Sequence, residues 1–76
     1  PMPSPALIGI DLGGTKCAVS VPAGPHGVRE VARFPSAGPV ETLARVHAEV
    51  AALRPGPHVV FGVSCGGPLD ARAGLI

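Results

Sequence analysis

The sequence is poor in aromatic residues, in cysteine and in charge. Aromatic residues make up 3% of its 76 residues and charged residues 14%, with a formal net charge of +1. Because the few basic residues are scattered, neither nucleic acid nor an anionic membrane surface is an expected partner. Two cysteines far apart in the sequence exclude a disulfide framework, and we expect Cys17 and Cys65 to be reduced, semi-buried thiols.

The chain also lacks a long hydrophobic run and a targeting signal. No apolar run approaches the roughly 20 residues of a membrane-spanning helix. Residues 1–5 form a proline-rich leader without the charged start or the apolar core of a signal peptide, so we predict a cytoplasmic protein. Pro1 precedes Met2, which suggests that part of this leader is an expression remnant.

Length and composition indicate a piece of a larger protein. The 76 residues form at most one small domain, and a chain this short buries a smaller share of its surface than a full-sized domain does. Residues 73–76 are mostly apolar, whereas a natural C-terminus is more often polar. We therefore expect residues 6–76 to belong to a longer chain.

The predicted elements follow the order β-β-β-α-β. Periodicity and turn residues predict strands over 7–12, 16–21 and 28–34, a helix over 39–54 and a last strand over 58–64. The first strand is almost wholly apolar, so we expect it to be central and covered on both faces, with the charged third strand at an edge. Gly38 and Pro39 suit the start of the helix, and its apolar stripe should pack in the core. The last strand should lie parallel to the first after the helical crossover.

The turn after the first strand carries the strongest chemical signal. A carboxylate, two glycines, a hydroxyl and an ammonium follow one another there, as Asp11, Gly13, Gly14, Thr15 and Lys16. Glycines reverse the chain with backbone N–H groups exposed, and one carboxylate is a sufficient protein contribution for Mg²⁺ that also binds phosphate and water. We therefore predict a phosphate and magnesium corner. The alternative is a tight glycine hairpin with a capping Asp11. The spacing fits neither GxGxxG nor GxxxxGK[ST].

A second glycine-bearing loop follows the last strand. Gly66, Gly67 and Pro68 stand where open α/β sheets place ligands, close to the end of the first strand. The two glycines would let a polar ligand approach the backbone, and the alternative is a plain turn. The three histidines, His26, His47 and His58, are expected to be solvated or edge residues rather than ligands or bases.

The segments 8–16 and 62–70, Ile-Gly-Ile-Asp-Leu-Gly-Gly-Thr-Lys and Gly-Val-Ser-Cys-Gly-Gly-Pro-Leu-Asp, together resemble the ROK family (repressor, open reading frame, kinase). The family contains bacterial sugar kinases such as glucokinase and sugar-responsive repressors. The resemblance covers residues 6–76 and implies an α/β fold, namely the incomplete N-terminal lobe of an actin-like, ribonuclease-H-like ATPase.

The resemblance also implies roles for the two loops in ATP-dependent phosphorylation of a hexose by the full-length parent protein. Asp11 would hold the Mg²⁺ of ATP through water, Gly13 and Gly14 would line the β- and γ-phosphates, and Thr15 and Lys16 would flank them. The residues bordering the sugar pocket would be Gly66, Gly67 and Pro68. Phosphoryl transfer depends mainly on positioning and charge neutralisation, which a metal and backbone donors provide.

The resemblance places the family's catalytic Asp, and a Cys/His cluster for a structural Zn²⁺, beyond Ile76. No catalytic residue is therefore expected in this chain, and Asp70 is a poor substitute because it lies in a turn that the family uses structurally. We expect the isolated segment to be inactive and not to fold stably alone, and the full-length protein to be a homodimer or tetramer.

Three other functions stay open at this point. The first is a repressor of the same family, which would carry a winged helix-turn-helix ahead of the first strand. The others are an actin-like acyl or acetate-type kinase and a catalytically inactive structural fragment. The acceptor sugar is not identified by these residues, and glucose is the default of the family.

Overall fold

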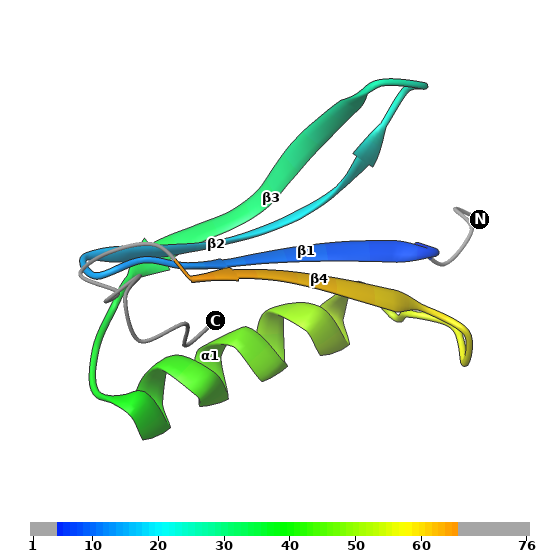
Figure 1. Ribbon diagram of the computed structural model, residues 1–76. Coiled ribbons are helices and arrows are strands. Elements are labelled where there is room, and N and C mark those ends of the chain that lie inside the picture. Colours follow the sequence, from blue (N-terminus) through cyan, green and yellow to red (C-terminus); the bar gives the residue numbers. More distant parts are fainter. Residues whose placement is uncertain (1–4, 66–76) are drawn as a thin grey trace, which may run out of the picture.

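The computed structural model describes residues 5–65, which form a four-stranded mixed sheet with one helix on it (Figure 1). The elements are β1 (Leu7–Leu12), β2 (Lys16–Ala23), β3 (Gly27–Pro35), α1 (Pro39–Ala52) and β4 (Val60–Cys65). The strand order is β3-β2-β1-β4, with β1 antiparallel to β2 and parallel to β4. This small α/β domain confirms the predicted element order and is consistent with a ribonuclease-H-like or actin-like N-terminal lobe.

The hairpin of β2 and β3 is longer than the sequence predicted. Pro22 and Ala23 were expected in the turn, but they pair with Val28 and Gly27. Proline is tolerated here because β1 pairs with β2 only as far as Ser20, so the missing N–H of Pro22 interrupts no bond to β1. Gly24, with a φ of 71°, provides the turn itself.

Two other predicted boundaries also differ. α1 ends at Ala52, two residues before the predicted end, with Leu53 as its C-cap and Arg54 at a φ of 52°. β4 begins at Val60, because the preceding residues turn back through a hydrogen bond from the Val59 N–H to the Gly56 carbonyl of 3.4 Å. The start of the helix is as predicted, with Gly38 as N-cap and Pro39 in the first turn.

The core lies between the sheet and α1. Its buried members alternate along the strands and come also from the helix, namely Ile8, Cys17, Val19, Val21, Phe34 and Val46. The expectation that β1 is covered on both faces is wrong for the described chain, because α1 covers only one face (Figure 1). Ile8, on that face, is 0% exposed, whereas its neighbour Leu7 on the other face is 43% exposed.

Only the C-terminal half of the apolar stripe of α1 packs as predicted. Val46 is buried and Val50 is half-buried against the core, but Val40 and Leu43 are 78% and 58% exposed. The reason is that the N-terminal end of α1 stands away from the sheet (Figure 1). A cavity of about 370 Å³ lies there between the β1–β2 turn and the helix, lined by Leu12, Gly13, Gly14, Cys17, Ser36, Ala37, Pro39, Thr42 and Leu43.

An arginine of α1, Arg45, covers the aromatic ring of Phe34 in β3. The guanidinium carbon of Arg45 lies 4.7 Å from the ring centroid of Phe34, a distance typical of a cation–π contact. Glu49, one turn further along α1, accepts a hydrogen bond of 2.7 Å from Arg45 Nε. Phe34 is therefore buried under a polar side chain that stays in contact with water.

The two faces of β1 predict different responses to truncation. Ile8→Ala should lower the free energy of unfolding by about 2–5 kcal/mol, because a cavity opens in the core. Leu7→Ala, in the same strand on the open face, should cost about 1 kcal/mol or less. Chemical denaturation of both variants in the full-length protein tests this difference, and equal losses would contradict the one-sided core.

Candidate functional site

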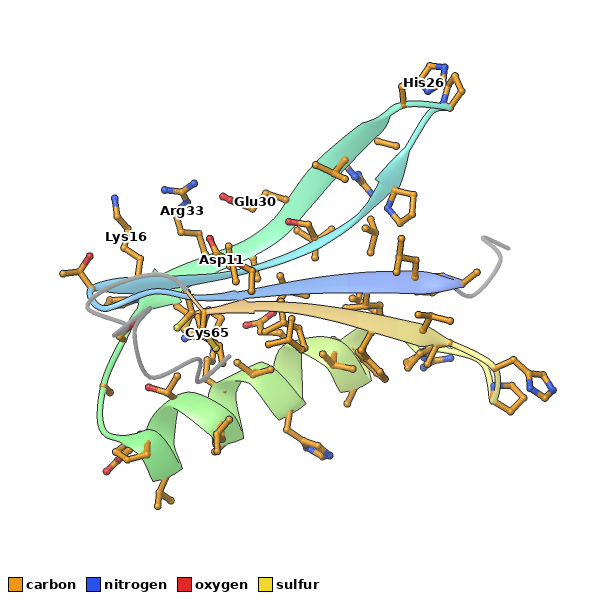
Figure 2. The ribbon with its side chains drawn as sticks, viewed as in Figure 1. Asp11, Lys16, His26, Glu30, Arg33 and Cys65 are labelled. Atoms are coloured by element: carbon orange, nitrogen blue, oxygen red, sulfur yellow. The ribbon has the colours of Figure 1, made fainter. Side chains whose placement is uncertain are left out.

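The charged candidates gather on the face of the sheet that α1 leaves open. Figure 2 shows Asp11, Lys16, Glu30 and Arg33 projecting to this side, away from the helix. The strand register explains their grouping, because Asp11 pairs with Ala18 and Ala18 pairs with Arg33 across three adjacent strands. Paired residues in a sheet point to the same face, so this cross-strand row carries a carboxylate and a guanidinium.

A depression of about 140 Å³ lies over this row. It is lined by Asp11, Thr15, Lys16, Cys17, Ala18 and Arg33. Three of the residues predicted for the phosphate corner, Asp11, Thr15 and Lys16, therefore come together here. The depression has a small side chain, Ala18, between the acidic and the basic one.

The predicted glycine residues occupy a different position. Gly13 and Gly14 line the cavity on the helix side of the β1–β2 turn rather than the depression beside Asp11. The N–H of Gly13 donates to the Lys16 carbonyl at 3.0 Å, so this amide closes the turn and is not exposed as the sequence suggested. A Cβ atom at Gly13 would overlap that carbonyl oxygen, which explains why a glycine is needed there.

Ser36 stabilises this turn by hydrogen bonds, a role that the sequence analysis did not predict. Its Oγ donates to the Gly13 carbonyl at 2.8 Å and lies 3.3 Å from the Cys17 Sγ, and its N–H donates to the Thr15 carbonyl at 2.9 Å. The hairpin register could have predicted this contact. Lys16 pairs with Pro35, and this pairing places the next residue, Ser36, beside the turn.

A second depression, of about 370 Å³, adjoins the first. Its lining comes from three strands, as Gly9, Ile10, Asp11, Ser20, Gly62, Val63 and Ser64. Asp11 borders both depressions, and Ser64 Oγ donates to Asp11 Oδ1 over a long 3.5 Å. Gly9 pairs with both Ser20 and Gly62, so small residues line much of this floor.

The second predicted loop begins next to this depression. Gly66, Gly67 and Pro68, like Asp70, lie outside the described residues. The strand that leads to them ends level with β1, since Cys65 pairs with Leu12. Leu12 and Cys65, the last residues of β1 and β4, therefore lie side by side at the same end of the sheet.

The carboxylate of Asp11 is accessible to a ligand. It is exposed, and no described cation lies within ion-pair distance of it. Within residues 5–65 no three His, Cys, Asp or Glu side chains cluster as a protein-built metal site would require. Mg²⁺ is commonly held by one or two carboxylates, waters and substrate phosphates, and Asp11 fits that donor set.

Arg33 and Glu30 form an ion pair at the rim of the site. Arg33 Nε and Nη2 donate to the two carboxylate oxygens of Glu30 at 2.7 and 2.9 Å. This hydrogen bonding lowers the pKa of Glu30 below its ordinary value and raises the pKa of Arg33, with the charge of Asp11 adding to the latter effect. The site thus combines two basic and two acidic side chains on one face.

The remaining titratable candidates are three histidines and two cysteines. His26, His47 and His58 are all exposed, as the sequence suggested. The expectation of two semi-buried thiols is wrong, because Cys17 is buried and Cys65 is exposed, although neither forms a disulfide. Among residues 5–65, no helix has the length and apolarity needed to cross a membrane.

Comparison of the chain with protein-family models, with curated proteins and with solved structures finds no match.

The tight turn predicts that alanine is tolerated less well at Gly13 than at Gly9. Gly13→Ala should destabilise the protein by about 1–3 kcal/mol, because the new Cβ forces the turn away from Lys16. Gly9→Ala is the control, since its Cβ would meet its nearest heavy atom, the Ser20 carbonyl oxygen, at an ordinary 3.8 Å. Denaturant unfolding of the full-length protein measures both, and a Gly13→Ala variant as stable as Gly9→Ala would contradict the turn geometry.

The ion pair predicts the titration of Glu30. Its carboxyl should titrate below 4.5, so the stabilisation from the pair is complete above that pH and is lost as the pH falls through the lower, folded-state pKa. Carboxyl-detected NMR of the full-length protein measures this. Arg33→Ala should return the pKa toward 4.5, whereas Arg29→Ala, in the same strand, should leave it unchanged.

Proposed function

We propose that this chain supplies the phosphate and magnesium corner of an ATP-dependent sugar kinase of the ROK type. The observation that supports the proposal is the meeting of Asp11, Thr15 and Lys16 at one depression on the open face of the sheet. A carboxylate, a hydroxyl and an ammonium in one place match the needs of a Mg²⁺-bound polyphosphate.

Each of these side chains has a distinct task in the proposed reaction. Mg²⁺, when bound with ATP, neutralises charge on the phosphates and fixes their orientation. The Asp11 carboxylate would hold the ion at the end of β1 by accepting hydrogen bonds from its bound water. Lys16 adds a positive charge beside the transferred group, and the Thr15 hydroxyl donates to a phosphate oxygen.

Donors for the phosphates also come from the backbone of the turn. Since the Gly13 N–H is used within the turn and Gly14 lines the cavity on the helix side, the amide of Thr15 is the one that we assign to a phosphate oxygen. Ser36 keeps the turn in position through its bonds to the Gly13 and Thr15 carbonyls. A turn held in this way loses little entropy when the ligand binds.

The sugar would approach from the side of β4. The second depression shares Asp11 with the first. A sugar bound in the second depression would therefore lie next to the ATP phosphates, with the Asp11 carboxylate between them. Its floor of Gly9 and Gly62 leaves room for a polar ligand to lie against the backbone. Gly66, Gly67 and Pro68 would form the wall beyond, and the base that deprotonates the sugar hydroxyl would come from the longer chain.

A coupled ADP-release assay tests the proposal. The full-length protein is supplied with Mg²⁺-ATP and a panel of hexoses and N-acetylhexosamines, and turnover with one sugar would establish the kinase and identify its substrate. No turnover with any sugar would contradict it. Sugar-dependent DNA binding would then favour a repressor of the same family, and turnover with acetate would favour an acyl kinase.

Asp11 provides the sharpest test by mutation. Asp11→Asn in the full-length protein should lower kcat by ~10²-fold, the scale of losing one electrostatic contact in a transition state, with little change in the KM for sugar. Glu49→Gln, on α1 at the opposite face, is the control and should leave kcat unchanged. An Asp11→Asn enzyme with full kcat at saturating Mg²⁺-ATP would refute the role of Asp11.

A further inference from the structure

Arg33 lines the same depression as three of the predicted phosphate residues, Asp11, Thr15 and Lys16. It comes from β3, far from the Asp11 to Lys16 turn in sequence, and it shares the depression with Asp11, Lys16 and Ala18. Its side chain projects to the same side as those of Asp11 and Lys16 (Figure 2). The site therefore contains a second cation that is not part of the glycine turn.

The register brings Arg33 within reach of a ligand on Asp11. Ala18 separates the two residues in the cross-strand row, so their backbones are about 10 Å apart, twice the spacing of adjacent strands. The methyl group of Ala18 fills little of that gap, and Arg33 lines the depression together with Asp11. A phosphate group between the two would be small enough to contact Arg33 while its metal contacts Asp11.

Glu30 holds the guanidinium in a defined orientation. It accepts from Arg33 Nε and Nη2 at 2.7 and 2.9 Å, which leaves the Nη1 edge able to donate to another acceptor. Arginine remains positively charged, and its planar donor group matches the spacing of phosphate oxygens. A guanidinium already oriented by a carboxylate loses less rotational freedom on binding than an unrestrained one.

We propose that Arg33 binds phosphate oxygens of the nucleotide opposite Asp11, as a second cation beside Lys16. This role rests on the proposed kinase function and extends it, because it adds a residue from β3 to the phosphate site. The ligand chemistry is that of a polyphosphate chain, free or part of a nucleotide.

Titration calorimetry on the full-length protein tests the proposal with Mg²⁺-ATP and with magnesium tripolyphosphate as probes. Arg33→Ala should weaken binding of both probes by ~10-fold or more, the scale of losing a charge-assisted hydrogen bond. Arg33→Lys should recover only part of the affinity, because an ammonium cannot form the paired contact. Arg29→Ala, which removes an exposed arginine of the same strand outside the depression, should change neither affinity by more than about 2-fold.

The outcomes separate this proposal from the function on which it rests. If the unaltered protein binds Mg²⁺-ATP and Arg33→Ala binds it as tightly as Arg29→Ala does, the role of Arg33 is refuted and the kinase proposal stands. If Arg33→Ala loses ATP affinity but keeps its affinity for tripolyphosphate, the contact is not to phosphate and the proposal also fails. If the unaltered protein binds neither probe, both proposals fail together. Circular dichroism of each variant confirms that the fold is intact.

Discussion

β1 and β4 run parallel, and a parallel pair needs a connection that crosses one face of the sheet. α1 is that connection, and it buries Val46 against Ile8 and Val19 on the way. Once the helix takes this face, alternate residues of each strand point toward it and the residues between them point away. The open face, with its charged side chains, is therefore a direct consequence of how the chain returns to pair with its own first strand.

The same pairing also determines which residues lie together at one end of the sheet. In a parallel pair both strands end at the same end of the sheet, so Leu12 and Cys65 lie level with each other. Asp11, one residue before the end of β1, lies between the two depressions and contributes to both. The backbone of Asp11 is held by pairing with β2 on one side and β4 on the other. Its carboxylate is therefore exposed but attached to a rigid central strand.

The sequence predicted the element order, the parallel pair and the start of the helix, because these depend on local features such as apolar periodicity and the Gly38-Pro39 dipeptide. It also placed Asp11, Thr15 and Lys16 together. It missed Arg33 and Ser36, because their positions depend on which residues face each other across a hairpin, and a bulge near Ser20 shifts that register. The exposure of the N-terminal half of the apolar stripe of α1 could not be predicted for a similar reason. Periodicity indicates which face of a helix is apolar, but not how far that face lies from the sheet.

The floor of the open face is made of very small side chains, Gly9, Gly62 and Ala18, with Ser20 beside them. Such a floor has almost no relief, so it sets how closely a ligand approaches the sheet but gives little preference for one ligand outline over another. If a ligand binds here as proposed, its selectivity would come from the loops around the rim rather than from the sheet. A change in those loops alone would then alter which ligand is accepted, while the strands stay the same.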